Sequence, residues 1–400
     1  MPQSMYGFSV PFQFPVYFTR DAFAPDNTTV VNVFRRVEPE RRHRVFFAID
    51  RLAAAGRPQL GSEIDAYCRA HGESLKLVAD PLVLDGGEAV KNDLAHPLAM
   101  QARFNDLRLD RQSFVAVIGG GALLDMVSFA AAIAHRGIRV VRFPTTVLSQ
   151  ADSGVAVKNG VNLFGKKNFI GTFVPPFAVI NDACFLDSLE YRDVLAGISE
   201  AVKVSLLRDT GLFRFIEAHA RGLANRDSAT LEYVVRRSAE LHLEHICGNG
   251  DPFELGSARP LDFGHWAAHK LESLTAHRLR HGEAVAIGMA LDIMYSVRLG
   301  FLEDAVAGRI LALLETLGLP LWDVALRSTS TDGGLELVEG LREFREHLGG
   351  ELHITLLRDI GESFEVHEMD EAEVRGAIDD LAERASAAAL RGIGAGASAR

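Results

Sequence analysis

Hydrophobic and polar residues alternate with different periods in the two halves of this chain. In the first half, four short apolar runs have the length and composition of buried strands: residues 45–49, 75–78, 113–118 and 138–143. Helical patterns at residues 56–71 and 122–135 lie between them. Such alternation predicts an α/β domain with a doubly wound, mostly parallel sheet of the Rossmann type.

After residue 182 the strand-like runs give way to long amphipathic patterns. Residues 187–246, 264–276 and 282–317 read as helices, and one short strand returns at residues 353–357. We expect an α/β domain over residues 1–183, a mostly α-helical domain over 184–386, and a flexible Ala- and Gly-rich tail over 387–400. A length of 400 residues also favours two domains.

The chain begins with a segment, residues 8–18, that roughly alternates and contains two prolines. This pattern fits an edge strand or an extended arm better than a signal peptide. No run of about 18 apolar residues is present, so no helix is expected to span a membrane. The three cysteines lack CxxC spacing, which favours reduced thiols and a cytoplasmic location.

The net charge restricts the choice of partners. With 42 Lys and Arg against 53 Asp and Glu, the chain carries a charge of −11. Such a surface is repelled by phosphate backbones and anionic lipids, so neither nucleic acid nor a membrane is expected as a partner. An anionic substrate would need a local cluster of Lys and Arg.

A glycine turn follows the strand at residues 113–118. Gly119, Gly120 and Gly121 open a helix, where unpaired amides and the helix dipole favour an anion. The spacing departs from GxGxxG because Leu124 stands at the third glycine position, so an ordinary strand–helix turn is the alternative. Asp125, one turn into the helix, favours a cofactor site.

Other residues at the expected strand ends match a nucleotide site. Asp50 ends the strand at residues 45–49, where an acid can bind a ribose diol. Glu88 and Lys91 follow a glycine pair, and Thr145 and Thr146 follow the strand at residues 138–143. Each residue alone also fits an ordinary turn, but together they predict a nucleotide site.

Histidines and one glutamate have the spacing of metal ligands. His265 and His269 are four residues apart and share a helix face, although Trp266 replaces the glutamate of a zinc protease motif. His281 begins a later helix, and Glu200 lies one turn before Lys203. One Glu with two His would suit Zn²⁺ or a similar ion. Spacing alone does not tell which two histidines bind it, and ordinary core or surface roles remain the alternative.

Cations and amides cluster between residues 152 and 171. Lys158 and Asn168 lie among glycines with Lys166 and Lys167, and Arg136 follows the helix at residues 122–135. In a chain of charge −11, this clustering indicates a phosphate or carboxylate site. A solvated lysine-rich loop is the alternative.

In this order, these motifs resemble the sugar phosphate cyclases, the superfamily of 3-dehydroquinate synthase. The resemblance runs over about residues 45–300. It rests on Gly119-Gly-Gly121 with Asp125, Arg136-Gly137, Pro144-Thr-Thr146, Asp152 with Lys158, Lys167-Asn168, Glu200 with Lys203, Phe263-Gly-His265 and His281-Gly-Glu283. It implies an NAD-binding α/β domain, a helical metal domain, an active site in the cleft between them, and a homodimer.

The resemblance also assigns roles to residues. It implies that Glu200, His265 and His281 bind one divalent ion, Zn²⁺ or Co²⁺. NAD contacts fall on Asp50, Glu88, Lys91, Gly119, Gly120, Gly121, Asp125, Thr145, Thr146 and Asp152. Catalytic and substrate-binding roles fall on Lys203, Lys158, His269, Asn168, Arg136 and Asp262, with Arg136 reaching across a dimer interface. The implied reaction is transient oxidation by NAD⁺, phosphate elimination, re-reduction, ring opening and aldol cyclisation of a heptulose phosphate.

Departures from 3-dehydroquinate synthase bear on the substrate. Ala258 and Asp262 stand where that enzyme usually carries Arg and Asn, and Asp262 would repel a substrate carboxylate. The Pro-Leu-Asp262 pattern resembles that of 2-epi-5-epi-valiolone synthases, which cyclise sedoheptulose 7-phosphate. The surrounding sequence is most similar to the EboD-type branch. An alternative substrate is the deoxy-heptulosonate phosphate of 3-dehydroquinate synthase. Two other classes of protein also remain: an alcohol dehydrogenase of the glycerol dehydrogenase type, and a catalytically silent binding protein.

Overall fold

The computed structural model describes residues 5–164, 166–248, 252–253, 261–331, 333–347 and 351–397. Ala258, which bears on the substrate prediction, lies outside these residues. The chain divides into two compact units. Unit 1 comprises residues 1–149 and 153–188, and unit 2 comprises residues 150–152 and 189–400.

Unit 1 contains a seven-stranded parallel sheet with the order β1-β9-β6-β5-β2-β3, in which β4 also pairs with β2. The strands are β1 (Val16–Thr19), β2 (His43–Asp50), β3 (Leu75–Leu77), β4 (Leu82–Leu84), β5 (Phe114–Gly119), β6 (Arg139–Pro144) and β9 (Ala178–Asp182). From β2 the chain builds first toward β3 and β4, and then crosses to β5 on the other side. Ligands of open α/β sheets bind at the carboxyl ends of strands beside such a reversal.

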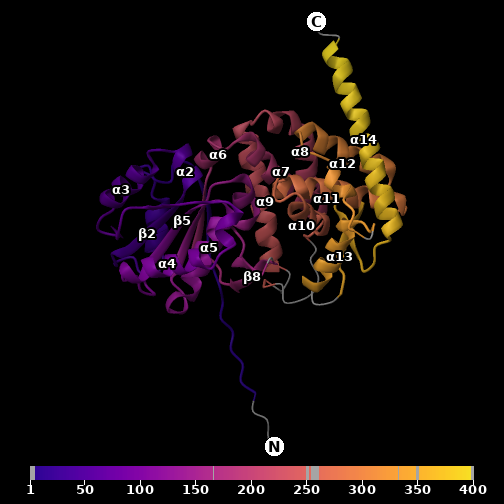
Figure 1. The fold of residues 1–400 in the computed structure, drawn as a ribbon. Coiled ribbons are helices and arrows are strands. Elements are labelled where there is room, and N and C mark those ends of the chain that lie inside the picture. The colour runs from indigo at the N-terminus through magenta and orange to yellow at the C-terminus, as the bar shows by residue number, and fades with distance from the viewer. Residues whose placement is uncertain are drawn as a thin grey trace, which may run out of the picture. The chain divides into compact units, whose positions relative to one another are not determined.

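Helices cover both faces of this sheet (Figure 1). Along β2, Val45, Phe47 and Ile49 pack with α1 (Thr29–Arg35) and α3 (Leu60–Ala70), whereas Phe46 and Ala48 pack with α4 (Ala95–Asp106) and α5 (Gly121–Ile133). Successive strand side chains point to opposite faces, so both faces acquire a core. This arrangement confirms the predicted doubly wound α/β sheet.

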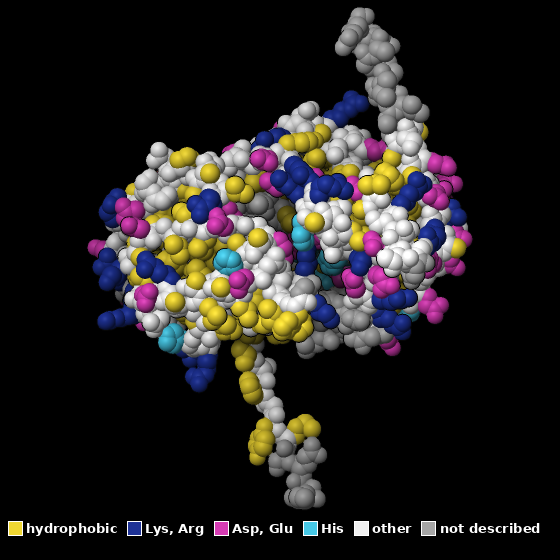
Figure 2. Space-filling model, in the orientation of Figure 1, with side chains coloured by type: hydrophobic (Ala, Val, Ile, Leu, Met, Phe, Trp, Pro, Cys, Tyr) yellow, Lys and Arg dark blue, Asp and Glu magenta, His cyan; other side chains and the backbone are white. Residues whose placement is uncertain are grey.

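The N-terminal segment takes the extended form that its sequence predicts. β1 is an edge strand of the sheet, and the described residues before it, 5–15, have no regular secondary structure. Met5, Tyr6 and Phe8 are 89%, 91% and 94% exposed. Figure 2 shows hydrophobic side chains along this segment.

The lysine- and glycine-rich segment forms an antiparallel hairpin of β7 (Lys158–Leu163) and β8 (Lys166–Phe173). Gly160 and Gly171 lie opposite each other, and a Cβ on Gly160 would approach the Ile170 carbonyl oxygen to 2.7 Å. Val161 joins the core cluster of α5. The hairpin is therefore packed against a helix rather than being a solvated loop.

Unit 2 is mostly helical, as predicted. Its helices are α7 (Tyr191–Arg208), α8 (Thr210–Ala224), α9 (Ser228–Gly248), α10 (His265–Leu274), α11 (His281–Arg298), α12 (Asp304–Leu317), α13 (Glu336–His347) and α14 (Glu371–Ala397). The predicted strand at residues 353–357 corresponds to β10 (Ile354–Asp359), which pairs with β11 (Glu362–Val366). The helix α14 includes much of the segment predicted as a flexible tail.

Two buried helices form the centre of unit 2. Every residue of α7 from Val194 to Leu207 is buried, and most of α11 is buried as well. The two backbones approach so closely at Gly282 that a Cβ there would lie 2.0 Å from the Ala196 carbonyl oxygen. Among the described residues, no helix is both long and apolar enough to cross a bilayer.

Candidate functional site

The carboxyl ends of β2 and β5 bring Asp50 beside the glycine turn in unit 1. A Cβ on Gly119 would lie 3.1 Å from the Asp50 Cβ, and one on Gly86 would lie 1.9 Å from Asp50 Oδ2. Asp50 immediately precedes α2 (Arg51–Gly56), and its carboxylate accepts the Leu52 N–H at 2.7 Å. Burial raises the pKa of Asp50, and nearby backbone N–H groups, including that of Gly120, oppose the rise.

The glycines leave the start of α5 open to a ligand. Gly120 is the residue that precedes the first turn, and as a glycine it has no side chain with which to cap that turn. A Cβ on Gly121 would meet Ser153 Oγ at 2.6 Å. The first amides of α5 therefore form the type of anion cradle found at helix N-termini, next to an acid suited to a ribose.

A buried polar network adjoins this cradle. Lys91, in the 3₁₀-helix η1 (Glu88–Lys91), is 4% exposed. Its Nζ lies 2.7 Å from Asp125 Oδ2 and donates to Asn168 Oδ1 at 2.5 Å. Burial raises the pKa of Asp125, and the Lys91 charge opposes the rise. Asn162 links the network by donating to Glu88 Oε1 at 2.7 Å and accepting the Asn168 N–H at 2.8 Å.

The remaining predicted residues of unit 1 lie at two ends of the sheet. Thr145 donates its N–H to the Gly119 carbonyl oxygen at 3.0 Å, so Thr145 and Thr146 lie at the glycine turn. Lys158 begins β7, and its side chain is exposed. Arg136 follows α5 in a left-handed conformation with φ +64°. The 13 residues of α5 separate Arg136 from the glycine turn by about 20 Å.

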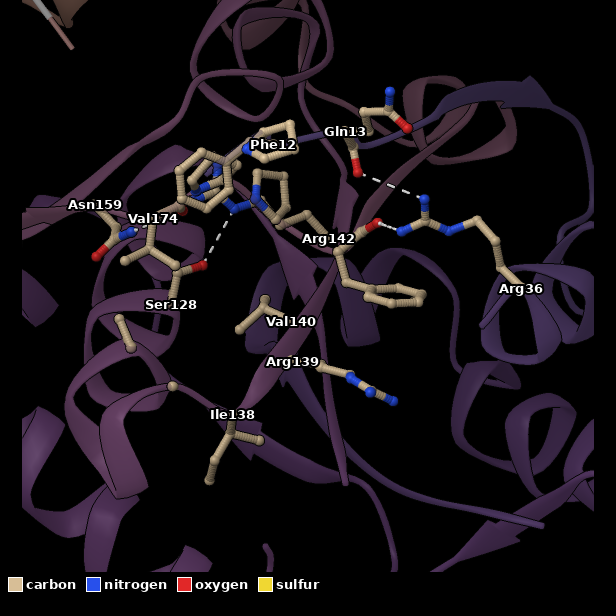
Figure 3. A pocket seen from close by; sticks show the side chains of 16 residues that line it. Phe12, Gln13, Arg36, Ser128, Ile138, Arg139, Val140, Arg142, Asn159 and Val174 are labelled. Carbon is tan, nitrogen blue, oxygen red and sulfur yellow. Dashed lines mark hydrogen bonds between the residues drawn. The ribbon is translucent and has the colours of Figure 1, made fainter. Parts of the chain in front are cut away.

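A cavity of about 310 Å³ in unit 1 lies at the opposite end of β6 from the glycine turn (Figure 3). Its lining includes Phe12, Arg36, Arg142 and Phe177. Arg142 donates to Ser128 Oγ and to the carbonyl oxygens of residues 154, 156 and 158, and Arg36 donates to the Phe177 carbonyl oxygen. The described residues that line this cavity do not include Lys158, Asn168 or Arg136, which were predicted to bind the phosphate.

In unit 2, Glu200, His265 and His281 converge, although 81 residues of sequence separate the first from the last. His265 is the first residue of α10 and His281 the first of α11, while Glu200 lies in α7. The Glu200 Oε1 atom lies 3.6 Å from His265 Nε2 and 3.4 Å from His281 Nε2. Glu200 is fully buried.

These distances fit three ligands of one ion better than direct hydrogen bonds, which prefer 2.7–3.2 Å. Tetrahedral bonds of about 2.0–2.1 Å to Zn²⁺ would place ligand atoms about 3.3 Å apart. Neither oxygen of Glu200 makes a hydrogen bond of good geometry among the described residues. The donor set of one carboxylate and two imidazoles therefore fits a divalent metal.

The second nitrogen of each imidazole is held in place. His265 Nδ1 lies 3.2 Å from the Phe263 carbonyl oxygen, and His281 Nδ1 lies 3.2 Å from Glu272 Oε2. Glu272 is a buried residue of α10. Such partners fix the tautomer and would direct Nε2 toward a metal ion held by the three residues. Glu272 is thus a member of the site that spacing did not identify.

The charges around Glu200 decide the protonation states. Burial would raise the pKa of Glu200, but Lys203, whose Nζ lies 2.6 Å from Oε2, and the two histidines hold it well below its ordinary value. Burial, with help from Lys203, lowers the pKa of His265 to about 3, so its imidazole is neutral and able to bind a metal. Burial would also lower the pKa of Lys203, but Glu200, Asp152 and Asp262 raise it.

Lys203 therefore stays charged within a group of acids. Asp152, which was predicted to contact the cofactor, belongs to unit 2, where its Oδ1 lies 3.3 Å from His242 Nε2. His242 is buried and was not among the predicted residues. His269 is exposed, and its ring centre lies 5.4 Å from that of His265 and 6.1 Å from that of His281. This cluster combines the candidate metal ligands with a cation, acids and the exposed imidazole ring of His269.

Comparisons with known proteins agree with both halves of this arrangement. Residues 81–196 match the 3-dehydroquinate synthase N-terminal family, and residues 197–337 match the 3-dehydroquinate synthase C-terminal family. A 3-dehydroquinate synthase of Cereibacter sphaeroides is 34% identical over 349 residues, covering 86% of this chain and 90% of that protein. The chain belongs to the 3-dehydroquinate synthase-like family of sugar phosphate cyclases.

Two relatives within this family carry another name. A 2-epi-5-epi-valiolone synthase of Streptomyces glaucescens is 37% identical over 278 residues, which cover 68% of this chain and 70% of that protein. The solved 2-epi-5-epi-valiolone synthase of Streptomyces hygroscopicus, with NAD⁺ and Zn²⁺ bound, is 27% identical, covers 95% of this chain and 100% of the other, and gives a TM-score of 0.83. The cyclase family is thus confirmed from sequence and from fold.

Three site residues escaped prediction for different reasons. His242 and Asn162 act through partners distant in sequence, Asp152 and Glu88, and no local spacing marks such pairs. Glu272 lies seven residues after His265, two turns along the same helix face, which is a signal that helical periodicity could have provided.

Proposed function

We propose that this chain is an NAD- and metal-dependent sugar phosphate cyclase that converts a heptulose phosphate into a carbocycle with loss of phosphate. The observation that carries the proposal is the convergence of Glu200, His265 and His281 with Lys203 beside them. The solved relative with bound NAD⁺ and Zn²⁺ supports the choice of cofactors. A cytoplasmic homodimer belongs to the same proposal.

The chain provides a place for each cofactor. The glycine turn with Asp50 would hold NAD⁺, with the first amides of α5 facing its phosphates and Asp50 facing a ribose. Glu200, His265 and His281 would hold Zn²⁺ or Co²⁺. When bound, NAD⁺ accepts a hydride and returns it later, and the metal supplies Lewis acidity toward a substrate hydroxyl.

The remaining residues handle charge and protons. The Lys203 ammonium, kept charged by its acid neighbours, stabilises negative charge that develops on a substrate oxygen. His269 presents an exposed imidazole beside the two ligand rings and is suited to exchange protons with substrate. Lys158 and Asn168 are proposed to bind the phosphate. Arg136 lies about 20 Å along α5 from the glycine turn of its own unit, so its proposed role requires a second copy of the chain.

The acids around Lys203 favour a substrate without a carboxylate. Asp152 and Asp262 both act on the Lys203 charge, and a carboxylate near them would be repelled. Sugar hydroxyls instead can donate hydrogen bonds to such acids. We therefore place sedoheptulose 7-phosphate ahead of the deoxy-heptulosonate phosphate, and the two relatives named 2-epi-5-epi-valiolone synthase support this order.

The test is a panel of heptulose phosphates incubated with purified protein, NAD⁺ and Zn²⁺ or Co²⁺. We expect release of inorganic phosphate without net NADH, fastest with sedoheptulose 7-phosphate. Steady NADH accumulation with alcohols would instead indicate a dehydrogenase. The His265→Ala variant is the control, since it should lose both bound metal and phosphate release. Unchanged metal content in that variant would refute the ligand assignment.

A further inference from the structure

The proposed mechanism leaves one buried acid of unit 2 without a role. Asp292, in the fourth turn of α11, is fully buried. Its Oδ2 accepts the Gly264 backbone N–H at 2.9 Å, and its Oδ1 accepts the Trp266 indole N–H at 2.9 Å. Burial raises the pKa of Asp292 to about 7, while the hydrogen bonds from Trp266 and Gly264 act to lower it. An acid in this position costs stability, so its presence needs a physical reason.

Both hydrogen bonds end on the neighbours of one metal ligand. Gly264 and Trp266 are the residues before and after His265, so a single carboxylate holds the chain on either side of that histidine. Gly264 adopts φ +76°, and a Cβ there would lie 2.6 Å from the Met289 backbone nitrogen. Trp266 is 1% exposed. The turn that starts α10 is therefore seated directly on the backbone of α11.

The same helix carries a second ligand. α11 begins at His281, three turns before Asp292, and is buried along most of its length. The two hydrogen bonds that Asp292 accepts from Gly264 and Trp266 form a clamp. This clamp would fix the position of His265 relative to His281. We propose that Asp292 is a positioning residue that sets the place of His265 in the metal site. The inference rests on the proposed metal site and adds a residue with no contact to the metal.

The chemistry of the clamp requires a carboxylate. Two N–H donors converge on the side chain, and a carboxylate offers an acceptor oxygen to each. Asparagine has nearly the same shape but only one acceptor, so its amide NH₂ would face one of the two donors. Removing the indole N–H by Trp266→Phe would relieve that conflict. Asp292→Asn and Trp266→Phe should therefore be energetically coupled.

The experiment measures affinity for Co²⁺ by competition with a chelator, together with the visible absorption of bound Co²⁺. The proteins are wild type, Asp292→Asn, Trp266→Phe, the double variant, and Leu314→Ala. Leu314 is a fully buried residue of α12, and its truncation is the control for lost stability without a changed clamp. Thermal unfolding of each metal-free protein defines a temperature at which all are folded.

We expect Asp292→Asn to weaken Co²⁺ binding about 10- to 100-fold, as loss of outer partners commonly does, and to alter the absorption spectrum. The double variant should lose less than the product of the two single losses, and Leu314→Ala should bind Co²⁺ as wild type does. Wild-type affinity and spectrum in folded Asp292→Asn would overturn the inference. If Asp292→Asn does not fold, equal Co²⁺ binding by Trp266→Phe and wild type would overturn it. A wild-type protein that binds no Co²⁺ would refute the proposed function itself.

Discussion

The close approach of α7 and α11 at Gly282 gives a prediction whose size follows from the geometry. A Cβ on Gly282 would lie 2.0 Å from the Ala196 carbonyl oxygen, whereas ordinary contact begins at 3.4 Å. Gly282→Ala must therefore move the two backbones apart by about 1.4 Å, the difference of these two distances. Glu200 lies one turn after Ala196 on α7, and His281 adjoins Gly282 on α11. The displacement thus acts on two of the proposed metal ligands at once.

The expected cost has two parts. Overpacking typically destabilises by about 1–3 kcal/mol, and a clash between two backbones belongs at the upper end of that range because no side chain can rotate away. The better helix propensity of alanine recovers about 1 kcal/mol. Metal sites tolerate ligand displacements of about 0.2 Å, far less than the required movement. We expect a lower unfolding temperature and at least a tenfold loss of Zn²⁺ affinity.

Thermal unfolding with and without Zn²⁺, and chelator competition for Zn²⁺, measure the two effects. Gly308→Ala is the matched control because Gly308 lies within α12 and a Cβ there meets nothing within 4 Å. That variant should gain up to about 1 kcal/mol and bind Zn²⁺ normally. If Gly282→Ala matched Gly308→Ala in both measurements, the idea that a glycine contact sets the distance between ligand helices would be wrong.

Three further predictions address charge. Lys203→Ala should abolish phosphate release while NAD⁺ binding, measured by calorimetry, stays normal; a variant that cyclises at the wild-type rate would show that Lys203 is dispensable. Glu272→Gln should weaken Zn²⁺ binding about tenfold or more because His281 loses its carboxylate partner, and unchanged affinity would remove Glu272 from the site. Burial raises the pKa of Asp292 in the folded protein to about 7 from 3.8. The difference in free energy of unfolding between wild type and Asp292→Asn should therefore be most favourable to wild type below pH 4. That difference should fall as pH rises to about 7, and a constant difference in denaturant titrations would contradict the pKa.

The fold was predictable from periodicity because each element of unit 1 buries a face. Apolar runs such as residues 45–49 have no polar side, and this is what a strand covered by helices on both faces requires. The hairpin of β7 and β8 was not predicted, because its strands are rich in glycine and asparagine. Those residues are depleted in strands generally. Here Gly160 and Gly171 are needed because the two backbones approach too closely for a Cβ.

Sequence could predict only those parts of the site whose residues lie at a characteristic spacing along the chain. The i, i+4 spacing of His265 and His269 pointed to α10, but spacing gave no reason to propose His281 rather than His269 as the second ligand. The choice depends on which imidazole meets Glu200, 65 residues before His265, and only folding decides it. The positioning groups Asp292 and Glu272 look like ordinary helix residues in sequence, since their roles depend on partners in other elements or turns.

The charge balance around Lys203 connects the acidic composition with the substrate. Glu200, Asp152 and Asp262 act on Lys203, and Glu272 contacts His281, so four carboxylates adjoin the metal site. The Lys203 ammonium and one divalent ion supply three positive charges opposite these four carboxylates. A substrate carboxylate would add another in surroundings where charges are poorly screened, whereas a hydroxyl-bearing head group adds none. This balance favours the neutral head of sedoheptulose 7-phosphate. It also predicts that Asp262→Asn should raise the relative rate with a carboxylate-bearing heptulosonate phosphate, and a variant with unchanged preference would show that Asp262 does not select the substrate.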